Sequence, residues 1–158
     1  MTISQADFDN PVHARAIPRI VNAYAMEPQG GGKSLSAEVL ANMVPGMKAL
    51  PGAVTFLAWI GEEPVGAAIC FQGFSTFASK PLINVHDLSV VETHRGQGIG
   101  SLLLRAVEEY ARSRGCCKVT LEVREENPHA ERLYRKLGYG NPDGFATRFL
   151  DKPFGKKS

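Results

Sequence analysis

Four stretches of the chain carry apolar residues at a spacing near 3.6, which is typical of helices that pack through one face. They are residues 11–26, 37–43 or slightly beyond, 99–114 and 128–137. Polar residues and glycines mark their ends: Ser36 and Asn127 can cap N-termini, and Gly115 and Gly138 can stop the third and fourth helices. The pattern therefore predicts four amphipathic helices.

Other stretches are short, apolar or alternating, and rich in strand-forming residues. They are residues 53–60, 65–71, 83–91, 117–123 and 145–150. The first two flank Gly61-Glu62-Glu63-Pro64, which predicts an antiparallel hairpin, and residues 72–81 are expected to form a loop. A predicted helix connects the third of these stretches to the fourth, and this order predicts a right-handed parallel crossover between the two strands. The expected fold is α/β: a mixed, mostly antiparallel sheet with one parallel strand pair and helices on both faces.

Length and composition narrow the class of protein. With 158 residues, 44% hydrophobic and 22% charged, the chain fits one soluble domain over residues 1–158. No apolar run is long enough to cross a bilayer, and the first ten residues have two acids and no basic or apolar leader, so we expect a cytoplasmic protein without a membrane partner. A net charge of +2 gives no reason to expect nucleic-acid binding.

Three cysteines, Cys70, Cys116 and Cys117, show no C-x-x-C spacing. An odd number with two sequence neighbours fits reduced thiols better than a disulfide framework or a zinc site. We therefore expect no bound metal.

A glycine-rich segment, Arg95-Gly96-Gln97-Gly98-Ile99-Gly100, lies between a predicted strand and a predicted helix. Glycines at a helix N-terminus expose backbone N–H groups to a phosphate, because no side chain stands in the way. The arrangement therefore predicts a phosphate-binding loop, although glycines chosen only for a tight turn would give the same local pattern.

Two other phosphate-binding motifs fit less well. Gly30-Gly31-Gly32-Lys33-Ser34 imitates a Walker loop, but Glu27 occupies the position of its first glycine and a helix precedes it where a strand is required. A dinucleotide-binding fingerprint is a minor alternative, since its third glycine falls at Ser101 and the unit follows a hairpin and two helices.

A family resemblance favours a third phosphate-binding motif. Residues 88–100 resemble the Q/R-x-x-G-x-G/A signature of the GNAT acetyltransferases, with Arg95, Gly98 and Gly100 at its defined positions. Residues 127–139 resemble that family's second signature, an Asn, a short helix with a Tyr, and a Leu-Gly-aromatic ending. The hairpin before them is also similar, so the likeness covers roughly residues 53–139. It implies a GNAT fold with a splayed parallel strand pair.

The resemblance implies acetyl-CoA as cosubstrate and a primary amine as acceptor, with direct attack in a ternary complex. The pyrophosphate would lie on the loop and the helix N-terminus, and the pantetheine arm would run beside Leu88, Ser89 and Val90, where the N–H of Leu88 can polarise the acetyl carbonyl. Asn127 could cap its helix, contact the cofactor, or both. The cofactor-binding residues expected in the loop are Arg95, Gly96, Gln97, Gly98, Gly100 and Ser101.

Catalytic roles follow from the same resemblance. Tyr134 occupies the position of the family's general acid, although its place on an apolar stripe would also suit a core aromatic. His86 is a candidate base because histidine titrates in the useful range and arylalkylamine acetyltransferases carry one at this place; a core histidine is an equal alternative. Asp87 is a reserve base, which strand alternation places on the opposite face from His86.

The acceptor amine is not identified by the sequence. Phe74 and Phe77 could line its pocket or pin a loop to the surface. A small-molecule or peptide amine is the expected partner, and a homodimer is a further expectation from the family. The competing function from another class is a non-catalytic acyl-CoA-binding or sensing module.

Overall fold

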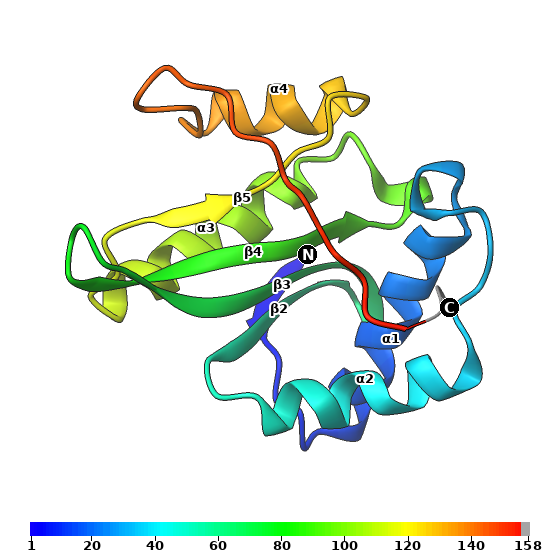
Figure 1. The fold of residues 1–158 in the computed structure, drawn as a ribbon. Coiled ribbons are helices and arrows are strands. Elements are labelled where there is room, and N and C mark those ends of the chain that lie inside the picture. Colours follow the sequence, from blue (N-terminus) through cyan, green and yellow to red (C-terminus); the bar gives the residue numbers. More distant parts are fainter. Residues whose placement is uncertain (156–158) are drawn as a thin grey trace. The chain divides into compact units, whose positions relative to one another are not determined.

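The computed structural model describes residues 1–155. The chain forms two compact units, Met1–Leu121 and the part that begins at Glu122. The first unit holds a five-stranded sheet in the order β1-β2-β3-β4-β5 (Figure 1). Its strands are β1 (Thr2–Gln5), β2 (Ala53–Ile60), β3 (Glu63–Ser75), β4 (Lys80–Val90) and β5 (Val119–Leu121). Neighbours from β1 to β4 are antiparallel and β5 is parallel to β4, as the sequence predicts.

The same unit contains three α-helices and two short 3-10 turns. The helices are α1 (Pro11–Met26), α2 (Ala37–Ala49) and α3 (Ile99–Ser113), and the turns are η1 (Pro28–Gly30) and η2 (Glu92–His94). Ser36 caps α2 as predicted, because its side chain accepts the N–H of Val39. The helix continues past the predicted end through Pro45, since burial of Val44 and Met47 rewards the extra turns.

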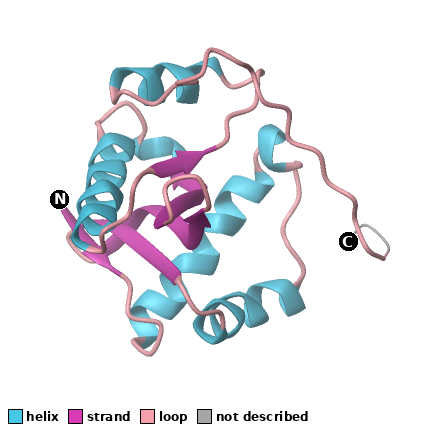
Figure 2. Ribbon diagram, turned by 60° about the vertical axis from the view of Figure 1, so that its left-hand side comes forward, coloured by secondary structure: helices cyan, strands magenta, loops and turns pink. Residues whose placement is uncertain are grey.

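The sheet is covered on both faces, as Figure 2 shows. One face packs against α1 and α2 through a single apolar cluster. Its buried members are Ala16, Ile17, Ile20, Val44, Met47, Leu57, Trp59, Ala67 and Ile69. The other face packs against α3, where the ring of Tyr110 meets Phe56 edge-on with centroids 5.7 Å apart.

Gly66 lets α3 approach the sheet closely. A Cβ at this position would lie 3.2 Å from a methyl of Leu103 and 3.3 Å from one of Ile99. Gly66 also pairs with Val90, the last residue of β4. The absence of a side chain at Gly66 therefore sets the first turn of α3 beside the end of β4.

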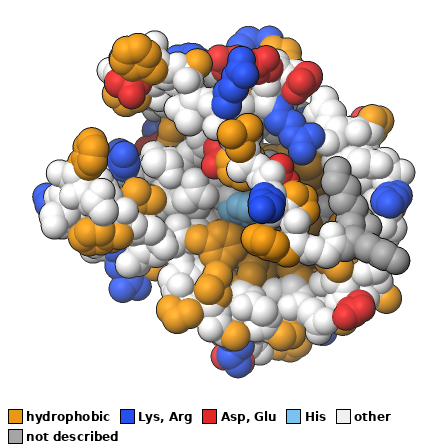
Figure 3. All heavy atoms as spheres, in the orientation of Figure 1, with side chains coloured by type: hydrophobic (Ala, Val, Ile, Leu, Met, Phe, Trp, Pro, Cys, Tyr) orange, Lys and Arg blue, Asp and Glu red, His pale blue; other side chains and the backbone are white. Residues whose placement is uncertain are grey.

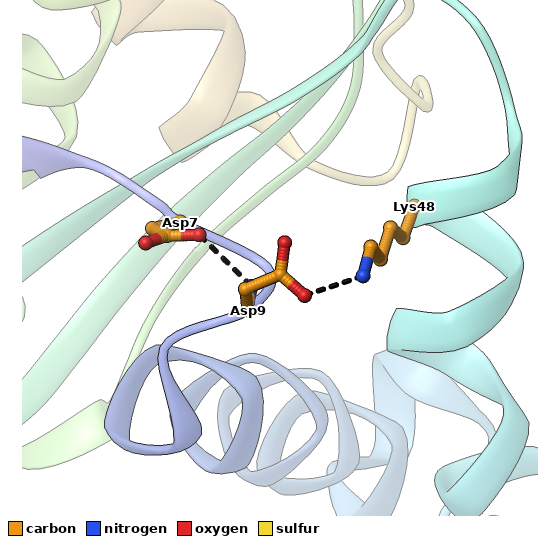
Figure 4. A network of polar contacts seen from close by, with 3 residues as sticks. All are labelled: Asp7, Asp9 and Lys48. Atoms are coloured by element: carbon orange, nitrogen blue, oxygen red, sulfur yellow. Dashed lines mark hydrogen bonds and ion pairs between the residues drawn. The ribbon is translucent and has the colours of Figure 1, made fainter.

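A polar network fixes the entry to α1 (Figure 4). A carboxylate oxygen of Asp7 accepts the N–H of Asp9 at 2.9 Å, which closes a local turn. The carboxylate of Asp9 pairs with the ammonium of Lys48, in the last turn of α2. The contact ties the segment between β1 and α1 to the end of α2.

Three sequence predictions are wrong. The strand β1 was not expected, because Ile3 is its one strongly apolar residue and its hydrogen bonds depend on pairing with the distant β2. Residues 72–81 are not a loop: β3 and β4 extend to Ser75 and Lys80 and join in a tight hairpin. Residues 145–150 form no strand, and each of them is exposed.

The second unit contains α4 (Pro128–Lys136). Asn127 caps it by accepting the N–H of Ala130 at 3.1 Å, and Pro128 occupies the first helical position. Gly138 follows with a φ of 91°, which suits the predicted glycine stop. This helix therefore begins and ends where the sequence indicates.

On the face of the molecule drawn in Figure 3, lysines and arginines are scattered among acidic and uncharged side chains. Among residues 1–155, no helix is both long enough and apolar enough to span a membrane.

Candidate active site

The glycine loop joins the turn η2 to α3. Gly96 and Gly98 have φ values of 76° and 80°, in the left-handed region that favours glycine. A Cβ on either residue would have no described atom within 4 Å. The two glycines are thus required by the backbone path and leave the space above the loop open.

The loop presents unpaired donors. Within residues 1–155, no hydrogen bond is found for the backbone N–H groups of Gly96, Gln97, Gly98 or Gly100. Gly98 is the N-cap of α3 and supplies no capping side chain, whereas Asn10, Ser36 and Asn127 cap the other α-helices. The positive end of the α3 dipole and these donors together suit an anion such as a phosphate. Ser101, in the first turn of α3, is half-buried beside them.

Arg95, the first residue of the motif, is held by two oxygens. Its Nε donates to the backbone oxygen of Val90 at 2.9 Å, and its Nη2 donates to Oε1 of Glu27 at 2.5 Å. The Arg95 side chain is 39% exposed and that of Glu27 is 21% exposed. The guanidinium is therefore already engaged by one carboxylate and one carbonyl.

Among the described strands, the second half of β4 has no strand partner on the side away from β3. The parallel pairing with β5 covers Ile83 to Val85 and ends at the pair Val85–Leu121. From Asp87 to Val90, β4 pairs with β3 alone among the described strands. Backbone groups of the segment Leu88–Val90 that point away from β3 have no strand partner, which is the opening that the predicted splay requires.

A β-bulge interrupts β4 at His86. Ile69 lies opposite Asp87 while the next residue, Cys70, lies opposite Val85, so His86 is the extra residue. The prediction that Asp87 points to the opposite face from His86 is wrong, because the bulge breaks the strict alternation. Asp87 Oδ2 and His86 Nε2 lie 4.0 Å apart.

Both side chains lie on the face covered by α1 and α2. Asp87 is opposite Ile69, a member of the apolar cluster on that face, and His86 meets the edge of Phe71, which packs against the same cluster. The ring centroids of Phe71 and His86 are 5.6 Å apart. The His86 side chain is 64% exposed, so it is not a core histidine and can reach solvent or a ligand.

Cys70, which pairs with Val85 across the strands, is buried. Burial raises the pKa of its thiol to about 12, and the negative charge of Asp87 adds to that rise. Cys70 therefore stays a neutral thiol near pH 7 and is not a nucleophile. No disulfide forms: all three cysteines are free.

The predicted acceptor residues lie at the far end of the β3–β4 hairpin. Phe74 pairs with Pro81, and Phe77 sits in the exposed tip. Alternation along β3 puts Phe74 on the opposite face from Phe71. The structure therefore does not bring Phe74 beside His86, and both phenylalanines are exposed.

Asn127 and Tyr134 belong to the second unit. The capping role expected of Asn127 is confirmed by its bond to Ala130. Tyr134 is half-buried, and its ring meets Tyr139 edge-on with centroids 6.2 Å apart. The role of its hydroxyl as general acid stays a prediction.

Glu27 and Phe71 were missed by the sequence reasoning. Glu27 is 68 residues from Arg95, and Phe71 contacts His86 only through the strand register. No local pattern marks either contact. Across the described part of the chain, no cluster of three His, Cys, Asp or Glu side chains could hold a metal ion.

Comparison with known proteins agrees with this geometry. Residues 19–139 match the model of the acetyltransferase (GNAT) family. The chain is 36% identical over 85 residues to streptothricin acetyltransferase of Streptomyces lavendulae, which covers 54% of this chain and 43% of the relative. It is 30% identical over 99 residues to thialysine N-epsilon-acetyltransferase of Caenorhabditis elegans, covering 61% of each. The matches thus span less than two thirds of these relatives.

The fold also matches a solved structure. The crystal structure of a probable acetyltransferase superposes with a TM-score of 0.82 at 20% identity, over 98% of this chain and 100% of that one. The agreement confirms the predicted mixed sheet with its one parallel pair. By its family match and its fold, this chain belongs to the GNAT family of acetyltransferases.

Proposed function

We propose that this protein transfers the acetyl group of acetyl-CoA to a primary amine. The observation that carries the proposal is the N-terminus of α3, where a glycine loop offers several unpaired N–H groups and no capping side chain. This donor set fits the pyrophosphate of CoA. Membership of the acetyltransferase family supports acetyl-CoA as the molecule that carries this pyrophosphate.

The chain's own residues would first hold the cosubstrate. Gly96, Gln97, Gly98 and Gly100 donate backbone N–H groups to the phosphates, and the hydroxyl of Ser101 stands beside them. The edge of β4 at Leu88, Ser89 and Val90 that faces away from β3 offers a path for the pantetheine arm, with the N–H of Leu88 as the donor to the acetyl oxygen. Asn127 contributes a cofactor contact by analogy with the family. Acetyl-CoA supplies the activated thioester.

Proton transfer would be carried by side chains. His86, exposed and next to Asp87, accepts the proton of the acceptor amine directly or through water. Asp87 holds a negative charge that favours an approaching ammonium group. Tyr134 donates a proton to the departing thiolate, a role taken from its place in the family's second signature.

The acceptor is proposed to be a small-molecule or peptide amine. The names of two relatives state acetylation of streptothricin and of the N-epsilon of thialysine, which supports an amine nitrogen as acceptor. Because His86 and Asp87 are exposed on the same face, an accessible primary amine can reach them. We take the site of action to be the cytoplasm and allow for a homodimer.

Free CoA release in the presence of an amine panel tests the function. We expect thiol release from acetyl-CoA that depends on the amine and yields an acetylated product detected by mass spectrometry. Tight binding of CoA without turnover by any amine would instead support a non-catalytic acyl-CoA-binding module. Binding of a nicotinamide dinucleotide in place of CoA would contradict both.

A further inference from the structure

Arg95 bridges two separate parts of the first unit. Its Nε reaches the backbone oxygen of Val90 at the end of β4, and its Nη2 reaches Glu27 at the end of α1. The two contacts use different nitrogens of one planar group, so the side chain acts as a rigid connector. Its charge is already balanced by Glu27.

Glu27 organises the turn that follows α1. It is the C-cap residue of α1, and its backbone N–H donates to the oxygen of Tyr24 at 3.0 Å. Its backbone oxygen accepts the N–H groups of both Gly30 and Gly32 at 2.9 Å. The same residue therefore holds the glycine turn through its backbone and Arg95 through its side chain.

The turn leaves little freedom around this residue. A Cβ on Gly30 would fall 2.0 Å from the backbone oxygen of Tyr24, so the turn lies directly against the end of α1. Further along, the side chain of Asn22 accepts the N–H of Leu35 at 2.8 Å. The segment between α1 and α2 is thus wrapped on α1, and Glu27 is its link to the glycine loop before α3.

We propose that Glu27 is a positioning residue, which through Arg95 fixes the CoA-binding loop against the end of α1 and couples that loop to the turn at residues 28–32. This inference rests on the proposed function for the role of CoA. In it, Arg95 shapes the loop and the backbone N–H groups bind the phosphates. The alternative is that Arg95 contacts the phosphates with its own charge.

The sign of one affinity change separates these roles. If the bridge positions the loop, Glu27→Ala weakens CoA binding about threefold to tenfold, the range for a partly exposed charged hydrogen bond. If Arg95 is a direct phosphate ligand, the same change frees the guanidinium and tightens binding. Glu27→Gln keeps an oxygen for the guanidinium and should stay within about twofold of the parent under the positioning role.

Arg95→Lys adds a second discriminator. Lysine keeps the charge but has a single nitrogen, which lacks the two-pronged geometry that spans Val90 and Glu27. We expect it to weaken CoA binding as much as Arg95→Ala does. Glu63→Ala is the matched control, because it removes a carboxylate from another, more exposed arginine pair, at 3.8 Å from Arg19.

Hydrogen exchange of the protein without CoA tests the bridge independently of the activity. Arg95→Ala should speed exchange at Gly30 and Gly32, whose N–H groups both bond to Glu27, and Glu63→Ala should leave their rates unchanged. With CoA added, the parent should show slower exchange at residues 29–32, and Glu27→Ala should lose that response.

Separate outcomes overturn the two proposals. Unchanged exchange at Gly30 and Gly32 in Arg95→Ala, or tighter CoA binding in Glu27→Ala, would overturn the positioning role. Failure of the parent to bind CoA in calorimetry would overturn the proposed function, while faster exchange in Arg95→Ala would still support the bridge.

Discussion

Two glycine-rich turns in this protein differ in whether their backbone N–H groups are already hydrogen-bonded. The turn after α1 satisfies its donors internally: Gly30 and Gly32 bond to Glu27, and Lys33 bonds to Ala25. The loop before α3 leaves the N–H groups of residues 96–98 unpaired within the described chain. The first turn follows a helix C-terminus and the second precedes a helix N-terminus.

The difference teaches that glycine content alone does not make a phosphate site. Donors must be unpaired and must stand at the positive end of a helix dipole. The turn at residues 28–33 fails on both counts, which is the physical reason that Gly30-Gly31-Gly32-Lys33-Ser34 is not a Walker loop. The preceding element is α1, as the sequence predicts, and not a strand.

The largest expected effect comes from a matched pair of glycine substitutions. Gly98 and Gly31 both have left-handed φ values, of 80° and 115°, and open space around a Cβ. Gly98→Val should weaken CoA binding by about 100-fold or more, because a side chain fills the space where the phosphates meet the N–H groups. Gly31→Val should carry similar backbone strain and lower the CoA affinity far less, because it leaves the space above the N–H groups of the loop open. Calorimetry with melting curves for both variants checks this, and equal losses in the two would break the comparison.

Tyr134→Phe should separate chemistry from binding. Removing the hydroxyl leaves the ring packing with Tyr139 in place and takes away the proposed acid. We expect kcat to fall about 10-fold to 100-fold, the lower range of general acid catalysis, with CoA affinity unchanged. Steady-state kinetics and calorimetry measure the two quantities. A parental kcat across the alkaline range would make Tyr134 a structural residue.

His86→Gln should have a smaller effect that depends on pH. Near neutral pH the acceptor amine is protonated and needs a base, so we expect about a tenfold lower rate. At a pH approaching 10, free amine is abundant and most of the rate should return. A pH–rate profile parallel to that of the parent would exclude His86, and a uniform loss would indicate damaged packing around the bulge.

The smallest effect is expected at the other glycine turn. Lys33→Ala combined with Ser34→Ala should change CoA affinity by less than about twofold, because neither side chain belongs to the loop before α3. The parent should bind no nucleoside triphosphate at this turn. Titration with ATP checks this, and binding that the double variant abolishes would restore the Walker interpretation.

Local signals explain which elements could be predicted. Asn127-Pro128 and Gly138 set the limits of α4 because a cap, a proline and a glycine stop act on neighbouring residues. The hairpin after Ile60 and the glycine loop follow from the same kind of short-range preference. By contrast, residues 145–150 have strand-like side chains and no strand partner within the described chain, so intrinsic preference alone did not produce a strand.

The sequence by itself determined the family, the helix caps and the loop whose glycines the backbone requires. Tertiary structure alone decided that His86 is a bulge residue near Asp87 and that Glu27 holds Arg95. Both depend on which residues meet across the fold: the bulge on the register between β3 and β4, and the bridge on how α1 packs on the sheet. Side-chain periodicity fixes the face of a residue within a regular element, but it carries no record of an inserted residue or of a partner 68 positions away.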